Sequence, residues 1–177
     1  SFDRLLKEYH TFLTEKMGLS ADNIHDEEVP AEDRAHYSKR TVDLEYDYPN
    51  GREELMGVAY RTDFDLGNIA KASGKSMEYR DKNSGEVFVP HVVEPSIGVE
   101  RLMLAVLAEA YTEDEIDGNT RVLLKLPEHL APYRFCVSPL LKNKPELVEK
   151  AHVVYDALKV KYGNVTWDDS GNIGKRY

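Results

Sequence analysis

The chain has 177 residues, of which 41% are hydrophobic and 31% charged, a composition typical of a globular protein rather than a disordered one. No apolar run reaches the roughly 20 residues that a membrane-spanning helix needs, and the N-terminal SFDRLLKEYHTFL is not a secretory signal, so we expect no membrane partner. A single cysteine, Cys136, excludes an internal disulfide and favours a cytoplasmic location. The six histidines lack the spacing of metal ligands.

The net charge of -9 is unevenly distributed along the chain. Residues 1–118 hold 13 Lys and Arg against 26 Asp and Glu, whereas residues 119–177 hold 10 against 6. This asymmetry predicts two units with different partners, of which the second tolerates a polyanion better. It is equally compatible with an acidic and a mildly basic domain that simply coexist.

A helix and a loop are predicted at the start of the chain. Apolar residues recur at steps of three and four over residues 2–17, and Gly18 is a natural stop for that helix. Residues 20–35 are acidic and irregular, which indicates a surface loop.

Two antiparallel strands are expected next. The segment 41–48, TVDLEYDY, alternates apolar and polar residues strictly, as a half-buried strand does. A turn at 49–51 separates it from a second strand at 55–60, LMGVAY.

The remainder of the acidic part predicts two helices and a third strand. Thr62 or Asp63 is a candidate cap for a short helix, and the segment 87–94, VFVPHVVE, reads as a strand. Residues 99–110 form a helix that is apolar on nearly every face, so we expect it to be deeply buried.

After a linker at 114–119, the second part alternates strand and helix. We expect strands at 133–140 and 164–167, with a helix between them that begins at Pro145 and ends at Gly163. The whole pattern indicates an α+β fold.

The join between the third strand and the buried helix, VEPSIGVERL, carries more polar residues than a turn requires. Arg101 lies in the first turn of the helix, where the helix dipole disfavours a cation unless an anion compensates it. That anion is either internal, from Glu54, Glu94 or Glu100, or a bound phosphate. Since structural ion pairs are commoner than sites, the spacing alone favours the internal pair.

Two further residues of the join have two interpretations each. Glu94 follows a strand of buried character and needs a cationic partner, either Arg101 or an ammonium from outside. Ser96 is either a small polar residue in the floor of a pocket or a cap for the helix.

EPSIGVER resembles motif 3 of class II aminoacyl-tRNA synthetases, in the form found in homodimeric glycyl-tRNA synthetases. The similarity extends upstream through AHYSKRTVDLEY, EELMGVAYRTDFDL and VPHVVEPS. Downstream it includes LPEHLAPYRFCVSPLLK and DDSGNIGKRY, so that it covers nearly the whole chain.

The resemblance implies the C-terminal half of a class II catalytic domain with an antiparallel sheet at 1–118, and the start of an α/β anticodon-binding domain at 119–177. We find no motif 1 and no motif 2. The chain is therefore expected to be an internal piece of a longer synthetase, inactive by itself.

The resemblance also implies roles for individual residues. Arg101 and Glu54 would be catalytic, acting on the ATP phosphates and their Mg²⁺. The ATP contacts would come from Glu54, Leu55, Gly98, Val99, Glu100 and Arg101. The glycine contacts would come from Glu94, Pro95, Ser96, Ile97 and Gly98. Cations of the second part expected to contact tRNA are Arg134, Lys142, Lys144 and Arg176.

Some residues depart from the family pattern or have simpler explanations. Glu100 replaces the usual aspartate of motif 3, and NGREEL stands where the family often has FGWGEL. From the sequence alone, Glu54 is a solvated residue after a turn or a partner for Arg52.

The expected activity is ATP-dependent activation of glycine to glycyl-adenylate and its transfer to tRNA(Gly), with ATP and Mg²⁺, in a cytoplasmic homodimer. The alternative is a non-catalytic synthetase-like protein that binds tRNA or a partner chain, which the absence of motif 2 favours. A class II enzyme of the prolyl, threonyl or histidyl type is a third possibility, against which the EPS triplet counts.

Overall fold

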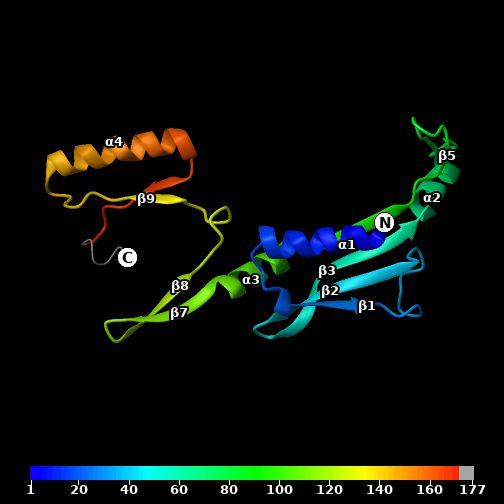
Figure 1. Cartoon of the computed structure of the whole chain (residues 1–177), viewed down its shortest axis with the longest axis horizontal. Coiled ribbons are helices and arrows are strands. Elements are labelled where there is room, and N and C mark those ends of the chain that lie inside the picture. The colour runs from blue at the N-terminus through cyan, green and yellow to red at the C-terminus, as the bar shows by residue number, and fades with distance from the viewer. Residues whose placement is uncertain (172–177) are drawn as a thin grey trace. The chain divides into compact units, whose positions relative to one another are not determined.

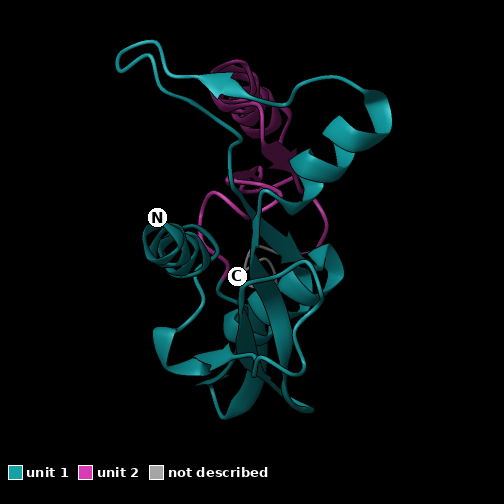
Figure 2. Cartoon of the chain, turned by 90° about the vertical axis from the view of Figure 1, so that its right-hand side faces the viewer, with its two compact units in different colours: residues 1–125 teal, residues 126–177 magenta. Residues whose placement is uncertain are grey.

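The computed structural model describes residues 1–171, and it divides into two compact units, residues 1–125 and residues 126–177 (Figures 1 and 2). The division between these compact units falls between Lys125 and Leu126. Within residues 1–171, no helix is both long and apolar enough to cross a bilayer.

The first unit is built on a four-stranded antiparallel sheet with the strand order β1-β2-β3-β6. These strands are Ile24–Glu28, Arg40–Tyr48, Gly51–Thr62 and Val92–Ile97, respectively. The two central strands, which the sequence allowed as a hairpin or as an adjacent return, form a hairpin, and the α+β class is confirmed. Figure 1 shows α1 running alongside this sheet.

The alternation of β2 separates a core face from a polar face. Val42, Leu44, Tyr46 and Tyr48 are buried, as predicted, and Leu44 is fully inaccessible to solvent. Leu44 belongs to a hydrophobic cluster that also contains Leu13 and Val58. The core therefore lies on one side of the sheet, which leaves the other side to polar residues.

The N-terminal helix is confirmed, but the loop expected at 20–35 is only partly correct. Helix α1, Phe2–Thr11, continues into a π-helical turn, η1 at Phe12–Lys16, and Gly18 has the positive φ of 74° that suits a helix stop. A 3₁₀ turn, η2 at Ala21–Asn23, then leads into β1.

Strand β1 was missed because its sequence, IHDEE, has no apolar alternation. Its side chains form ion pairs with neighbouring elements instead: Asp26 lies 2.7 Å from His10, and Glu28 accepts hydrogen bonds from Arg40. An edge strand held by backbone pairing and polar contacts gives little periodic signal.

Helix α3, Val99–Ala110, is not buried on all sides as its composition suggested. Ala105 and Ala110 are buried, and Leu102 and Val106 pack against the core cluster. The opposite face is open in this chain, where Met103 is 59% exposed. The expectation of deep burial was wrong because it counted apolar residues around the helix and not the neighbours available to cover them.

Two short hairpins and a helix complete the first unit. Helix α2 is Phe64–Ser73, and it is followed by β4, Tyr79–Arg80, paired with β5, Val87–Phe88. Asp63 occupies the N-cap position of α2, but its side chain makes no capping hydrogen bond. The strand expected at 87–94 is therefore interrupted, and its second half belongs to β6.

The linker expected at 114–119 is a hairpin. Strand β7, Tyr111–Ile116, pairs with β8, Asn119–Leu124, through a two-residue turn in which Asp117 and Gly118 have φ of 52° and 76°. Asp-Gly is the preferred sequence for such a turn.

The second unit is a short β-α-β unit, as predicted. Strand β9, Phe135–Val137, and strand β10, Val165–Trp167, are parallel, and helix α4, Pro145–Tyr162, connects them. Pro145 begins the helix and Gly163 follows it with φ of 77°. The ring of His152 stacks on Trp167 at 4.1 Å, which joins the helix to β10.

The one-sided packing of the sheet and of α3 predicts a contrast between two truncations. Leu44→Ala should lower the free energy of unfolding by about 2–5 kcal/mol, because it leaves a cavity in a fully buried site. Met103→Ala should change it by less than about 1 kcal/mol, because this side chain is mostly exposed. Urea denaturation of both variants checks this, and a large loss for Met103→Ala would show that the outer face of α3 is covered in solution.

Candidate functional site

The polar face of the sheet collects most of the residues that the sequence pattern selected. Asp43, Gly57 and Ser96 are cross-strand neighbours in one row over β2, β3 and β6, and Ala59 with Glu94 belongs to the next row. Cross-strand neighbours project to the same side of a sheet. Ser96 and Glu94 therefore lie on the face opposite Leu44.

Gly57 keeps the middle of this face open. A Cβ atom at Gly57 would lie 3.3 Å from Oδ1 of Asp43 and 3.5 Å from Oε1 of Glu54. The two carboxylate oxygens thus converge near the same point above the sheet. A side chain at position 57 would push them apart.

Glu94 lies within β6, and its partner is Arg61 rather than Arg101. Nη1 of Arg61 donates a hydrogen bond of 2.7 Å to Oε2 of Glu94. The same guanidinium donates two hydrogen bonds to Asp65, of 2.6 and 2.8 Å, and lies 3.8 Å from the ring centre of Tyr37. Arg61 is therefore held in a fixed position between two carboxylates and an aromatic face.

The electrostatics of this cluster follow from those contacts. The hydrogen bonds that Arg61 donates, first to Asp65 and then to Glu94, raise the pKa of Arg61, and those accepted by Asp65 lower the pKa of its carboxyl group. The Arg61 side chain is only 17% exposed, whereas that of Glu94 is 45% exposed. Glu94 can therefore meet a molecule from solvent while Arg61 stays behind it.

The sequence interpretation missed Arg61, although the residue lies in the RTDFDL segment. Its role becomes visible only when the pairing of β3 with β6 brings it to Glu94. Ser96 is part of β6, and the N-cap of α3 is Gly98 without a side-chain capping bond. The alternative interpretation of Ser96 as a helix cap was therefore wrong.

Arg101 approaches the same face from the first turn of α3, next to Glu54 of β3. Its guanidinium donates a hydrogen bond to the backbone carbonyl of Glu54, and Nη1 lies 4.0 Å from Oε2 of the same residue. The side chains of Arg101 and Glu54 are 52% and 53% exposed. Of the three internal anions considered, Glu54 is thus the partner of Arg101. The pair remains open to solvent.

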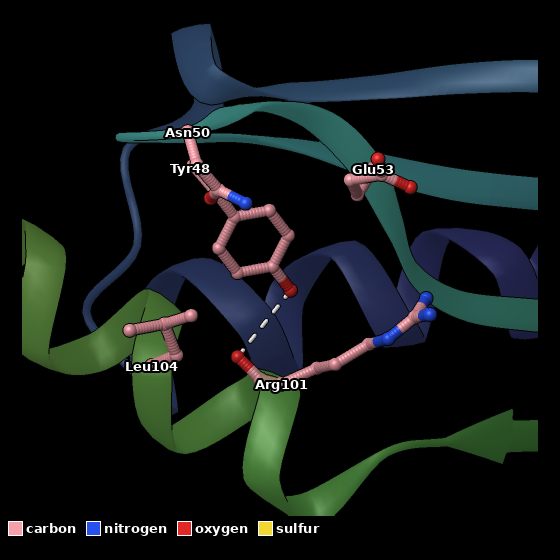
Figure 3. Close-up of a pocket in the computed structure, with 5 residues that line it drawn as sticks. All are labelled: Tyr48, Asn50, Glu53, Arg101 and Leu104. Atoms are coloured by element: carbon pink, nitrogen blue, oxygen red, sulfur yellow. Dashed lines mark hydrogen bonds between the residues drawn. The ribbon is translucent and has the colours of Figure 1, made fainter.

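Arg101 also lines a shallow hollow, whose residues Figure 3 shows. It has a volume of about 340 Å³ and is lined by Tyr48, Asn50, Glu53, Arg101 and Leu104. The hydroxyl of Tyr48 donates a hydrogen bond of 3.3 Å to the carbonyl oxygen of Arg101. This contact anchors the first turn of α3 to the end of β2.

The remaining members of the expected ATP and glycine sets are divided between the entry to α3 and the core face of the sheet. Leu55 is 1% exposed and packs in the core, so its side chain does not face the polar side of the sheet. Gly98, Val99 and Glu100 form the exposed entry to α3, and Pro95 and Ile97 project from β6 with Val58 and Met56 as their neighbours. Arg52 pairs with Asp47 at 2.8 Å and not with Glu54.

Asp43 is a second residue that the sequence did not single out. Burial first, and then the negative charges of Glu54 and Glu45, raise the pKa of its carboxyl group. The strict alternation of β2 placed Asp43 on the polar face, but nothing in the sequence distinguishes it from Asp47 or Glu45. Within residues 1–171, the structure brings together no group of three or more His, Cys, Asp or Glu that could hold a metal ion.

The cations expected to contact tRNA lie in the second unit, and three of them are described. Arg134 forms an ion pair with Glu128. Lys142 and Lys144 are exposed just before α4, and Lys142 lines a hollow of about 710 Å³ together with Asn143, Pro145, Val148, Glu149 and His152. Arg176 lies outside the described residues.

The raised pKa of Asp43 predicts a pH-dependent effect on stability. A carboxyl group whose pKa is higher in the folded state lowers stability as the pH rises above its unfolded pKa, near 3.8. Asp43→Asn should therefore raise the melting temperature at pH 7, and the gain should vanish below about pH 3.5. Thermal denaturation over this pH range checks it, with Asp114→Asn as the control. The pKa of Asp114 is lowered by Arg121, so that control should destabilise at pH 7. An equal or lower melting temperature for Asp43→Asn at pH 7 would contradict the prediction.

Comparisons with known proteins give a consistent family. The glycine–tRNA ligase of Mycoplasmopsis synoviae is 45% identical over 177 residues, which is 99% of this chain and 38% of that protein. The ligase of Malacoplasma penetrans is 47% identical over 177 residues, with 99% and 37% covered. The ligase of Thermus thermophilus is 45% identical over 180 residues, with 92% and 36% covered. No family model matches the chain.

A solved structure is similar in fold. The prolyl-tRNA synthetase of Giardia lamblia, in complex with prolyl-adenylate, matches with a TM-score of 0.63 over 99% of this chain and 34% of that one. Only 17% of the residues are identical, so the match concerns the fold alone. The chain spans less than two-fifths of the length of the curated relatives it matches. The resemblance that EPSIGVER indicated is thereby confirmed: over nearly its whole length, this chain is a homologue of part of the glycine–tRNA ligases, with the fold of a class II aminoacyl-tRNA synthetase.

Proposed function

We propose that this chain supplies the motif 3 part of the catalytic site of a glycine–tRNA ligase. The reaction would condense glycine with ATP to glycyl-adenylate and pyrophosphate, and then transfer the glycyl group to tRNA(Gly). The observation that carries this proposal is that the polar face of the sheet holds a carboxylate for an ammonium, Glu94, and also Glu54, which is the partner of a guanidinium for phosphates, Arg101. Catalysis would come from positioning and from charge stabilisation.

The ATP phosphates would take the place of Glu54 at Arg101. An ion pair at 4.0 Å with both side chains about half exposed contributes at most about 1 kcal/mol, so exchanging it for a phosphate costs little. A guanidinium fork suits a phosphate well. The first backbone N–H groups of α3, after Gly98, would add hydrogen bonds to the same anion.

The Mg²⁺ that accompanies ATP would use the carboxylates beside Gly57. This ion is usually held by one or two carboxylates together with substrate phosphates. Glu54 and Asp43 fit this requirement, because their oxygens converge above Gly57 and the two negative charges repel each other. Bound there, the ion would neutralise charge on the phosphates.

Glycine would bind between Glu94 and Ser96. Arg61 holds Oε2 of Glu94, and among residues 1–171 no hydrogen bond engages Oε1, which would accept from the substrate ammonium. Ser96, beside Gly57 in the neighbouring strand, would form part of the wall next to the α-carbon. Arg61 would act as a positioning residue for the carboxylate.

The second unit would belong to the tRNA-binding part of the protein. On the family pattern, residues 1–118 correspond to the catalytic domain and residues 119–177 to the opening of an anticodon-binding domain. Lys142, Lys144, Arg134 and Arg176 would contact tRNA phosphates, and the whole protein would be a cytoplasmic homodimer.

The proposal predicts that Arg101 is required for catalysis but contributes little to the stability of the fold. In a full-length protein that carries this sequence, Arg101→Ala should reduce glycine-dependent pyrophosphate exchange by roughly a hundredfold or more. Its melting temperature should stay nearly unchanged, because the pair with Glu54 is exposed. Arg121→Ala, which breaks a comparably exposed pair with Asp114, is the matched control.

Two outcomes of that experiment would contradict the proposal. A marked loss of melting temperature with exchange preserved would make Arg101 a structural residue. A wild-type protein that binds tRNA but shows no glycine-dependent exchange would favour the alternative, a non-catalytic synthetase-like protein.

The glycine pocket predicts a change in amino-acid preference. A methyl group forced against packed atoms costs about 1–3 kcal/mol, so Ser96→Gly should raise the ratio of alanine to glycine exchange by roughly five- to a hundredfold. Glu94→Gln should lower exchange with both amino acids and leave their ratio unchanged, because both carry the same ammonium. Pyrophosphate exchange with each amino acid measures these ratios. An unaltered ratio in Ser96→Gly would mean that the wall against larger side chains lies elsewhere.

A further inference from the structure

Residues 71–91, from the end of α2 through the β4–β5 hairpin, form an arm whose charge differs from the rest of its unit. Figures 1 and 2 both show the hairpin projecting beyond the end of the four-stranded sheet. The arm holds four Lys and Arg against three Asp and Glu, whereas the rest of residues 1–125 holds 11 against 23. The arm therefore carries a net charge of +1 in a strongly acidic unit, and within the hairpin Arg80 and Lys82 balance Asp81 and Glu86.

Arg80 stands out among the arginines of residues 1–171. The other eight each have a carboxylate oxygen within 4.0 Å, whereas Arg80 forms no ion pair in this part of the chain. Its one hydrogen bond there goes from Nη1 to the backbone carbonyl of Gly85, at 3.1 Å. Most of its donors therefore face solvent without an internal anion.

The turn of the hairpin is held in one conformation. Oδ1 of Asp81 accepts hydrogen bonds of 2.8 Å from the backbone N–H groups of both Asn83 and Ser84, and these bonds lower the pKa of Asp81. The Asp81 N–H donates to the carbonyl of Glu86 at 2.9 Å, and Gly85 takes the positive φ of 74° that closes the turn. The carboxylate of Asp81 is thus bound within the turn, and Arg80 and Lys82 flank this residue in the sequence.

The hairpin also carries two aromatic rings, on the face opposite the side chain of Arg80, because adjacent residues of a strand project to opposite sides. Tyr79 and Phe88 are cross-strand partners, with ring centres 5.8 Å apart in an edge-to-face arrangement, and they are 48% and 41% exposed. Exposed rings on a projecting hairpin indicate a binding surface. A hairpin that carries cations without an internal anion and exposed aromatic rings offers both contacts by which single-stranded nucleic acid is bound, namely phosphate pairing and base stacking.

The arm is also joined directly to the candidate glycine site. Phe88 and Glu94 are six residues apart, a distance of at most roughly 20 Å in extended chain. If the proposed function holds, the terminal ribose of tRNA must reach the glycyl carbonyl near Glu94. The nucleotides just before that ribose would then pass within reach of the arm.

We propose that the arm binds the single-stranded 3′ end of tRNA, with Arg80 and Lys82 on its phosphates and Tyr79 and Phe88 against a base. The inference rests on the proposed function for the identity of the RNA. RNA is favoured over a protein partner because Arg80 lacks an internal anion, and a protein that covers the exposed Tyr79, Val87 and Phe88 instead is an outcome of the test below.

The test compares charge-matched variants of the full chain in binding to a tRNA(Gly) transcript. Arg80→Gln with Lys82→Gln should weaken binding at least about fivefold and reduce the salt dependence by about 1.4 in the log–log slope, since each phosphate contact to a single strand contributes about 0.7. Arg4→Gln with Lys7→Gln removes the same charge from exposed positions of α1 and should have no such effect. Fluorescence anisotropy over a range of salt concentrations measures both quantities.

Two further measurements locate the contact. With a transcript that lacks its four 3′-terminal nucleotides, wild type and the arm variant should bind equally. Tyr79→Leu keeps apolar bulk on the hairpin but removes the ring, and it should weaken binding of the intact transcript about fivefold through lost stacking.

Equal affinities of the arm variant and the α1 control would overturn the inference. The inference would also be overturned if the arm variant bound the truncated transcript as much more weakly than wild type as it binds the intact one. A third contrary result would be an arm variant whose oligomeric state changes in sedimentation while its affinity for RNA is preserved. In a full-length protein that carries this sequence, the arm variant should retain glycine-dependent pyrophosphate exchange. Absence of exchange in the wild type would refute the proposed function while leaving the RNA-binding result to stand by itself.

Discussion

The pairing of β2, β3 and β6 is the constraint on which the candidate site depends. Leu44 and Val58 are fully buried on one side, and their burial fixes which residues project on the other. A slip of one residue in β6 would turn Glu94 and Ser96 toward the core and expose Ile97. The register of β2 with β3 shifts between Leu44 and Glu45, so that Leu55 is an extra residue of β3. Leu55 can therefore be buried in the core while Glu54 still pairs with Glu45. The packing of the hydrophobic face thus determines which side chains project from the polar face.

Two arginines on this face differ in how firmly they are held, and the difference separates their roles. Arg61 is 17% exposed and makes short bonds to Asp65 and Glu94, so removing it would leave two carboxylates without a counter-ion. Arg101 is 52% exposed and its carboxylate partner lies 4.0 Å away. A tightly bound cation keeps a neighbouring group in place, whereas a loosely bound one is free to exchange its anion for a ligand.

The elements with a periodic pattern of buried residues were predicted well from the sequence. Elements that depend on backbone pairing and ion pairs were predicted poorly. The alternation of β2, the N-terminal helix with Gly18 and the helix between Pro145 and Gly163 were predicted, because local pattern and capping residues determine them. Strand β1 was missed, since it pairs through its backbone and through ion pairs. The prediction of a linker at 114–119 was wrong, although Asp117-Gly118 is a sequence that favours a two-residue hairpin turn.

For the site, sequence and structure supplied different information. Motif resemblance selected Glu94, Ser96 and Arg101, which are close together in the chain. It gave no reason to select Arg61 or Asp43, because their importance comes from contacts across strands that are far apart in sequence. Long-range pairing of charged side chains is invisible to periodicity, and only the register of the sheet reveals it.

The distribution of charge around the polar face favours one orientation of a bound substrate. Glu94 lies towards one end of β6, whereas Arg101 follows its other end and meets Glu54. In the row between them Gly57 and Ser96 carry no charge, and the carboxylate of Asp43 lies at the β2 end of that row, with Glu54 near it. A molecule with an ammonium at one end and phosphates at the other would be favoured in one orientation and opposed in the reverse one, because each end would then face a like charge. Under the proposed function, that single orientation would bring the carboxylate of glycine, which lies between these two charges, next to the phosphate that it attacks.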